Sequence, residues 1–281
     1  MMKRILTGRK PVIHIIKYVF LCICSISIIY PLLFVFMSSL KSNDEIFSTP
    51  FDLPTMWNFK IYYDVWTEFN VQIYFMNSVY YAIVSVTIAV FISCMAAYGL
   101  TRMKWKLKGA TFGFILLGLM VPMHSGVVPL YIALNKLGFR DPKITLIGIF
   151  VAYAIPITIF IVSGFIHSLP IELEESAVIE GYGLIKAFFS IIVPLLKPVI
   201  ATVIIFDFLA VWNDFFAGLI FINQESDKTL QLGISRFQGN FSTKYADLLA
   251  AIMITIIPSI IVYTILQDQI ISGLTAGAVK G

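Results

Sequence analysis

The chain has 281 residues, of which 59% are hydrophobic and only 13% are charged, and its mean hydropathy is +0.89. Soluble domains carry about 25% charged residues, so this composition indicates a protein that crosses a membrane several times. The net charge of +4 is small, and the basic residues are scattered or flank apolar segments, so we expect no nucleic-acid partner.

Cysteines and histidines stand alone along the sequence. They are Cys22, Cys24, Cys94, His14, His124 and His167. The cysteines lie inside apolar segments without a partner at zinc-like spacing, so we expect core residues rather than disulfides or metal ligands. The histidines lie near the ends of apolar segments and form no catalytic set, which disfavours an intramembrane enzyme. We therefore expect no catalytic residues and no bound metal.

Six stretches are long and apolar enough to cross about 30 Å of hydrocarbon. They are Val12–Met37, Ile73–Gly99, Ala110–Leu134, Ile144–Ile166, Val199–Ile222 and Ala246–Ile271. Each is expected to be helical, because the bilayer offers no water to an unpaired backbone. The first stretch is too long for a signal peptide and is expected to be retained. The sequence thus predicts an all-α membrane protein with six transmembrane helices.

Basic residues predict the orientation of these helices. An even number of spans places both termini on one side. With the N-terminus inside, twelve of the twenty Lys and Arg residues fall in inside segments, most clearly at Lys3–Lys10 and Arg102–Lys108. Short segments rich in Lys and Arg stay in the cytoplasm. We therefore expect cytoplasmic N- and C-termini.

Two of the outside segments are long. Residues 41–70 contain Trp57, Tyr62, Tyr63 and Trp66, which fit equally an aromatic belt at the membrane interface or a surface for an external protein. Residues 223–245 are polar, and their simplest interpretation is an exposed loop.

Between the fourth and fifth spans lies the most acidic patch of the chain, Leu169–Pro198. Pro170 suits a first helical position, and the carboxylates of Glu172, Glu174 and Glu175 favour the positive end of a helix dipole. Gly181 and Gly183 should end this helix, and a second short helix from Leu184 should follow. The predicted product is a cytoplasmic helix–turn–helix with an acidic face, suited to a soluble partner.

This stretch resembles a motif of ABC importer permeases. Glu175-Ser176-Ala177, three residues, Gly181, nine residues and then Ile191-Ile192-Val193-Pro194 follow the "EAA" pattern of Glu-Ala-Ala, three residues, Gly, nine residues, Ile, any residue, Leu-Pro. Ser176 replaces an alanine and Val193 a leucine, both similar in size. The resemblance implies that this loop docks on an ATPase subunit. The implied docking residues are Glu174, Glu175, Ser176, Ala177, Gly181 and Pro194.

The second half of the chain resembles the sugar-importer branch of these permeases. Trp212-Asn213-Asp214, Leu232-Gly233, Phe237-Gln238-Gly239 and the ending Gly273–Gly281 are similar to the smaller membrane subunit of the maltose transporter. The resemblance implies that the tail contacts the ATPase. Its residues are Gly277, Ala278, Val279, Lys280 and Gly281.

The same resemblance implies a set of partners. These are a second permease subunit, two identical or different ATPase subunits, and an extracellular or periplasmic sugar-binding protein. The permease itself is expected in the bacterial cell (inner) membrane, in contact with lipid. The chain has no Gly-rich P-loop followed by Lys-Ser/Thr, so ATP and Mg²⁺ should be bound by the partners and this chain should hold no cofactor.

Polar residues inside the predicted spans are candidates for a sugar path, since ionisable groups are costly in hydrocarbon unless they face a cavity or a partner. The candidates are Asn77, Tyr153, Asp207, Trp212, Asn213 and Asp214. On a continuous helix Asp207 and Asp214 would share one face. The alternative for each residue is hydrogen bonding between helices or anchoring at the interface.

The resemblance therefore implies a permease subunit of an ATP-driven, binding-protein-dependent importer, working by alternating access, and the lack of Lys and Arg in the interiors of the spans favours a neutral saccharide. The expected organisation is an N-terminal helix and external loop at residues 1–72, then a permease core at residues 73–281. An ion-coupled secondary transporter with Asp207 as its ion site is the alternative; it would predict inverted repeats, and none is evident.

Overall fold

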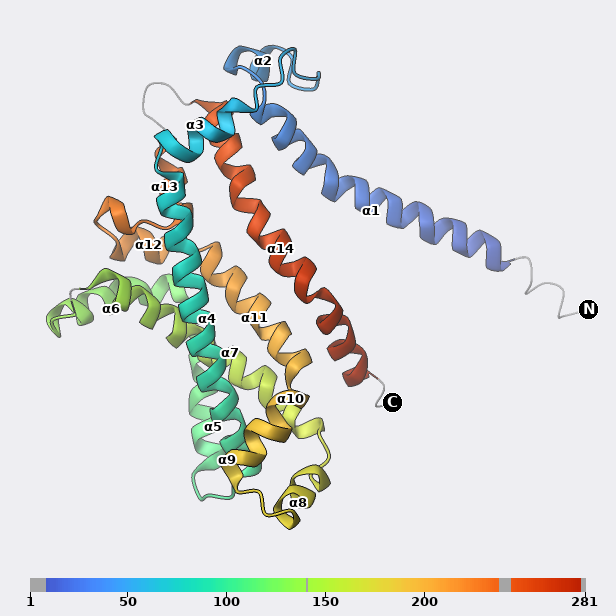
Figure 1. The fold of residues 1–281 in the computed structure, drawn as a ribbon, viewed down its shortest axis with the longest axis vertical. Helices are drawn as coiled ribbons and strands as arrows, with labels where there is room; N and C mark the ends of the chain where they lie inside the picture. Colours follow the sequence, from blue (N-terminus) through green and yellow to red (C-terminus); the bar gives the residue numbers. More distant parts are fainter. Residues whose placement is uncertain (1–8, 140, 238–243, 279–281) are drawn as a thin grey trace, which may run out of the picture. The chain divides into compact units, whose positions relative to one another are not determined.

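The computed structural model describes residues 9–139, 141–237 and 244–278, and every regular element in these ranges is a helix (Figure 1). The long helices are α1 (Arg9–Ser39), α4 (Val71–Arg102), α7 (Pro142–Ser168), α11 (Lys197–Trp212) and α14 (Tyr245–Ala278). The expected all-α class is confirmed. Within the described ranges, four helices are long and apolar enough to cross a membrane, and the number rises to six if each of two bent helix pairs counts as one span.

Of the described residues, 9–69, 236–237 and 244–254 form one compact unit, and 70–139, 141–235 and 255–278 form the other. In the first unit, α1 leads into α2 (Asn43–Ser48) and α3 (Lys60–Glu68). Ser42 and Glu45 form a capping box at the start of α2. Hydrogen bonds, foremost from the Thr55 hydroxyl, lower the pKa of Glu45 to about 2.

The second unit is built around α4 and α7, which pack against each other, with α11 against both. Small residues follow one face of α4 at steps of three or four and are fully or almost fully buried. They are Ser78, Ala82, Ser85, Ala89, Ser93 and Ala97. Small side chains let two helix backbones approach closely. In lipid the hydrophobic effect does not drive helices together, so such close packing is a main source of their association. Asp141 caps α7 by accepting from the amides of Lys143 and Ile144.

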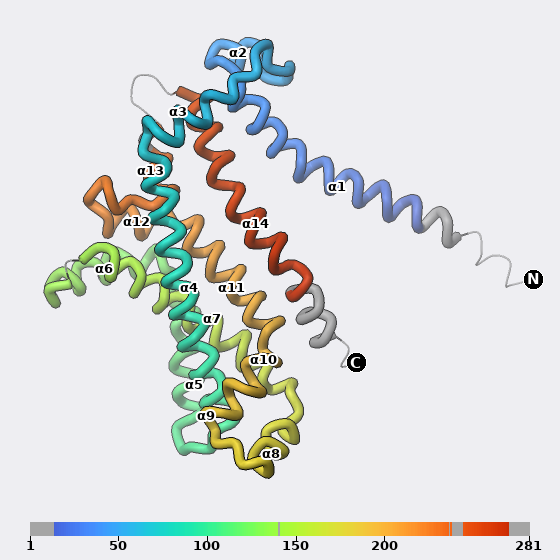
Figure 2. The backbone as a smooth tube through the Cα atoms, in the orientation of Figure 1, coloured from blue at the N-terminus to red at the C-terminus, as the bar shows by residue number. Residues whose placement is uncertain are grey.

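The third predicted span is not one straight helix. α5 (Lys108–Leu117) continues into η2 (Gly118–Met120), and α6 (Met123–Lys136) then leaves at 101°. Figure 2 shows the sharp turn between α5 and α6. Pro122 lacks the amide that would continue the helix, and Gly118 lies so close to Pro156 that an added Cβ would meet its ring at 2.8 Å. The bend therefore comes from proline and from close packing.

The fifth predicted span also differs from the expectation, because α11 ends at Trp212 and α12 (Phe216–Phe221) follows after a break. The expectation that residues 223–245 form an exposed loop is wrong for the part around α13 (Leu230–Ile234), where Thr229, Leu230 and Leu232 are buried. These residues pack on the first turns of α4, which the polar composition of the segment does not reveal.

Candidate functional site

The acidic stretch forms the expected pair of short helices. α8 (Glu172–Ile179) is followed by α9 (Leu184–Ala187), which continues through the π-helical turn η3 (Phe188–Ile192) into α10 (Val193–Leu195). We call residues 172–195 the hairpin. Gly181 has a φ of +81°, a left-handed conformation that favours glycine. α8 begins at Glu172 and not at Pro170; Leu169 is extended, and Ile171 is the residue directly before the helix.

The outer face of the hairpin combines acidic and large apolar side chains. Glu175 and Ser176 are exposed, whereas Ala177 is buried beneath them. Ile179 is 87% exposed and Ile185 is 76% exposed. Val178, Leu184 and Pro194 are exposed as well. Large exposed apolar side chains grouped beside charges are typical of a protein-binding surface.

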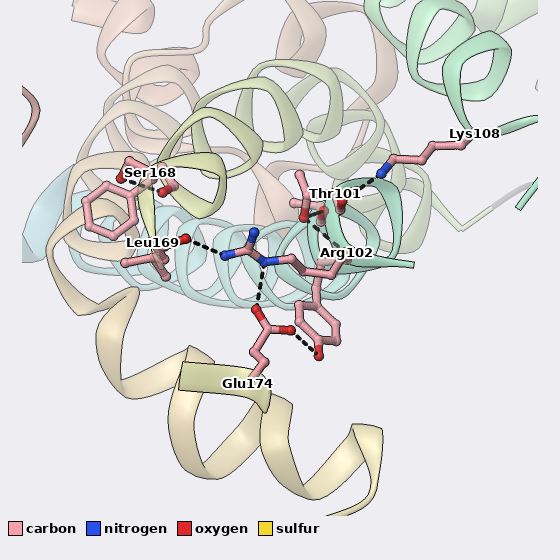
Figure 3. Close-up of polar contacts among 9 residues, drawn as sticks. Thr101, Arg102, Lys108, Ser168, Leu169 and Glu174 are labelled. Atoms are coloured by element: carbon pink, nitrogen blue, oxygen red, sulfur yellow. Dashed lines mark hydrogen bonds and ion pairs between the residues drawn. The ribbon is translucent and has the colours of Figure 1, made fainter. Parts of the chain in front are cut away.

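Glu174 faces the other way, into its own chain. Its carboxylate forms an ion pair with Nε of Arg102 at 2.6 Å, and it accepts a hydrogen bond of 3.0 Å from the Tyr98 hydroxyl. Arg102 also donates from its terminal nitrogen to the Leu169 carbonyl at 2.7 Å (Figure 3). Glu174 is thus engaged at the end of α4, while its neighbour Glu175 is exposed.

Asp207 and Trp212 are buried in contacts between helices. The Thr158 hydroxyl of α7 donates to the Asp207 carboxylate at 2.9 Å, and Asp207 is only 4% exposed. Trp212 is 1% exposed, donates to the Thr255 carbonyl of α14 at 3.0 Å, and stacks on Phe208. Its indole ring has no open face for a sugar in this conformation.

Asp214 caps the next helix instead of continuing α11. Its carboxylate accepts from the amides of Ala217 and Gly218 in α12 at 3.4 and 3.1 Å. The expectation that Asp207 and Asp214 share one helix face is wrong, because α11 ends at Trp212, before Asp214. A carboxylate at this position can bind backbone amides itself, which favours ending the helix over continuing it. Asn213 is exposed and bonds back to the Leu209 carbonyl.

Asn77 and Tyr153 also make internal contacts. The Asn77 amide donates to the carbonyls of Ser226 and Lys228 at 2.7 and 2.9 Å, so it holds the segment before α13. Tyr153 lies against Gly126 of α6, where an added Cβ would overlap its hydroxyl. The six proposed path residues are therefore distributed over several contacts and do not line one cavity.

Residues 89–275 match the model of the family described as "Binding-protein-dependent transport system inner membrane component". The chain belongs to this family. The match includes the hairpin, α11 and most of α14, so the Glu175–Pro194 motif lies inside it. The protein is thus a permease subunit of a binding-protein-dependent importer.

Two relatives and one solved structure are similar over most of the chain. The diacetylchitobiose uptake system permease protein NgcG of Streptomyces coelicolor is 34% identical, with 94% of this chain and 88% of that protein covered. The multiple sugar-binding transport system permease protein MsmG of Streptococcus mutans is 33% identical, with 94% and 96% covered. A chain in a crystal structure of a bacterial alginate importer matches with a TM-score of 0.79 at 21% identity, covering 92% of this chain and 96% of that chain. The family and these relatives identify a sugar-importer permease.

Two of the cavities in the second unit bear on the sugar path. The larger of these, about 690 Å³ and partly open, is lined by α4, α11, the later part of α14 and the hairpin residues Phe188, Phe189 and Val193, and its walls are almost wholly apolar. Such walls do not suit a hydroxyl-rich sugar. The smaller, about 150 Å³, is lined partly by Tyr131, Asn135, Asn223 and Gln224. Sequence reasoning missed these residues, because α6 was expected to cross the membrane.

The proposed tail contact falls largely outside the described residues. Gly277 and Ala278 end α14, whereas Val279, Lys280 and Gly281 are not described. Among the described residues, no group of three or more His, Cys, Asp or Glu side chains is arranged to hold a metal ion.

Proposed function

We propose that this permease couples ATP hydrolysis by partner subunits to sugar import by docking its hairpin on the ATPase. The observation that carries the proposal is the outer face of the hairpin, where exposed Glu175 lies one turn before exposed Ile179 on α8 and Ile185 of α9 is exposed as well. A carboxylate near exposed apolar side chains suits a pocket on the ATPase that contains a basic residue. When the apolar side chains exclude water, the attraction between the carboxylate and this basic residue becomes stronger.

The driving force must come from outside this chain, because the sequence has no P-loop. In the proposed cycle two ATPase subunits close, the hairpin moves, and the spans of this permease and a second permease alternate between outward- and inward-open forms. An external binding protein delivers the sugar. The hairpin then lies in the cytoplasm with both termini, in agreement with the basic residues at Lys3–Lys10 and Arg102–Lys108.

A neutral saccharide is the substrate class that we propose. α4, α7 and α11 carry no Lys or Arg between their first and last turns, so they offer no cation for a carboxylate or phosphate group. NgcG and MsmG, named for diacetylchitobiose and for multiple sugars, support a saccharide. Among the residues expected on the path, Asn213, just after α11, is exposed and could contact the sugar. The side-chain amides that line the smaller cavity offer a second polar surface.

The docking proposal is tested by reversing one charge on the hairpin. In the complex purified with its ATPase subunits and reconstituted in lipid, Glu175→Lys should abolish sugar-stimulated ATP hydrolysis while the permease stays in the membrane. Leaving a buried charge without its partner costs about 3–5 kcal/mol, enough to uncouple the subunits. Lys104→Glu, a reversal at an exposed site between α4 and α5, is the control and should keep full stimulation.

Normal stimulation in Glu175→Lys would refute docking through this face. Sugar uptake by the permease in vesicles without any ATPase subunit would instead support an ion-driven mechanism.

A further inference from the structure

We propose that Arg102 is a positioning residue that fastens the hairpin to the end of α4, so that a movement of the hairpin is transmitted along this span. The inference rests on the proposed function, since it assumes that the hairpin is what the ATPase moves. It assigns a role to Arg102, Glu174 and Tyr98, and we call these three side chains the joint.

Three separate elements meet at the Arg102 guanidinium. Arg102 is the last residue of α4, its Nε pairs with Glu174 of α8 at 2.6 Å, and its terminal nitrogen binds the Leu169 carbonyl directly after α7 at 2.7 Å. The Arg102 and Glu174 side chains are only 12% and 13% exposed. The contact with Glu174 is a close charge pairing without hydrogen-bond geometry, whereas the bond to the Leu169 carbonyl is a directional hydrogen bond.

Tyr98 ties both helices of the hairpin to α4. Its hydroxyl donates to Glu174 of α8, and its ring packs against the ring of Phe188 at 5.1 Å between centroids. Phe188 begins η3, the continuation of α9. One turn of α4 therefore contacts the first helix of the hairpin through Glu174 and the second through Phe188.

Adjacent carboxylates on α8 have opposite surroundings. Successive residues of an α-helix point about 100° apart, so Glu174 and Glu175 cannot both face the same partner. Glu174 is turned toward α4, whereas Glu175 is exposed. The proposal gives Glu175 the contact with the ATPase and Glu174 the contact that transmits its movement.

α4 is suited to carry that movement through the second unit. It is an unbroken helix of 32 residues, roughly 48 Å long at 1.5 Å per residue. Near its other end, Asn77 holds the carbonyls of Ser226 and Lys228, and Tyr81 donates to the Asp227 carbonyl at 3.1 Å. A displacement of α4 at the joint would therefore reach the segment that precedes α13.

The test uses the reconstituted complex with its ATPase subunits and binding protein. We expect Glu174→Gln and Arg102→Gln to leave subunit co-purification and ATP hydrolysis near wild type, because the docking face is unchanged. The number of sugar molecules imported per ATP should fall at least fivefold, because the hairpin moves without carrying α4. Glu172→Gln is the matched control, a carboxylate of the same helix turn that is exposed, and should keep the wild-type ratio.

A charge swap separates the joint from a merely structural contact. Arg102→Glu combined with Glu174→Arg should recover at least half of the wild-type sugar-to-ATP ratio, while each reversal alone should not. A wild-type ratio in both single glutamine variants would overturn the proposal. So would equal losses of co-purification, hydrolysis and import in the single variants without recovery in the swap, because that pattern belongs to a folding role.

The outcome for Glu175→Lys keeps the two proposals apart. If that variant loses sugar-stimulated hydrolysis while the joint variants keep the wild-type ratio, docking stands and the joint fails. If Glu175→Lys is fully stimulated, the docking proposal itself fails.

Discussion

Asp207 joins two helices through a single hydrogen bond with Thr158, well inside the membrane-spanning part of α11. Hydrogen bonds between transmembrane helices contribute on average about 0.6 kcal/mol, because the separated helices also find other partners. This contact gives the Asp207 carboxylate a partner, without which burial in an apolar environment would be unfavourable. The carboxylate could serve to pack α7 against α11, or it could belong to the sugar path, and experiment can distinguish these two roles.

Substitution at both ends of this bond distinguishes the two accounts. If packing is the role, Asp207→Ala and Thr158→Val should each lower the stability of the assembled complex by about 1 kcal/mol, and the double variant should lose no more than one of them. Thermal unfolding of the purified complex measures this, and Asp207→Asn, which keeps an acceptor for Thr158, is the control.

Sugar uptake by the same variants tests the path role. If Asp207→Ala impairs uptake while equally destabilised Thr158→Val does not, the carboxylate acts on the path. If both variants import at the wild-type rate, Asp207 has no place on the path.

The sequence indicated that Asp207 and Asp214 need partners, because both are carboxylates in a predicted span, but it did not indicate which partners. Thr158 is 49 positions from Asp207, and only the packing of α7 on α11 brings the two together. Asp214 satisfies itself locally by capping α12, a preference that carboxylates show at free helix amides. Arg102 was noted only as one of several basic residues flanking a span, so the joint could not be predicted.

Among the elements, the hairpin is the one whose conformation followed most directly from the sequence. The acidic first turn, Gly181 and the second helix from Leu184 are all present in the structure. The α5–α6 bend was not predicted, because apolar composition measures length in hydrocarbon and does not register a turn at Gly118–Pro122. A proline alone does not break a span, since α1, α7 and α14 are continuous helices with Pro31, Pro156 and Pro258 inside them.

Gly181 and Gly183 form a matched pair for testing the turn of the hairpin. Neither has an atom within 4 Å of an added Cβ, but only Gly181 has a positive φ, +81°, whereas Gly183 has −73°. A left-handed conformation costs a residue with a Cβ about 1 kcal/mol, so Gly181→Ala should weaken ATPase binding roughly fivefold. Gly183→Ala should leave it unchanged. Titration of the permease with ATPase subunits in detergent measures both, and equal affinities for the two variants would contradict the role of the turn.

At the scale of the whole molecule, the chain divides into two compact units that do not follow one cut in the sequence. Of the described residues, 244–254 belong with residues 9–69, and residues 255–278 belong with the larger unit. The extent of the family resemblance suggested a division near residue 72, because the first span and the following external segment carry little of it. The return of residues 244–254 to the first unit depends on contacts such as that between the Asn43 side chain and the Ala246 amide, 203 positions apart.

The ending of the chain carries a prediction that involves the whole complex. Deleting residues 277–281 should lower sugar uptake severalfold without reducing the amount of permease in the membrane, if the tail contacts the ATPase as the family resemblance implies. Uptake in cells and quantitation of the permease in isolated membranes measure the two effects. Wild-type uptake after the deletion would show that this end is dispensable, as many chain ends are.

The hydrogen bond between α4 and the start of α13 affects where a tag can be inserted to determine which side of the membrane a segment faces. The Ser78 hydroxyl of α4 accepts a hydrogen bond from the Leu230 amide at 2.7 Å, and Leu230 is 0% exposed. The surrounding sequence is polar, so on sequence alone it would be chosen for an epitope tag or a protease site. An insertion after Leu230 would break this anchor, and an antibody or protease would then report on a damaged fold. Asp52 and Leu53 are exposed, so an insertion between them should be read by such reagents in the intact protein.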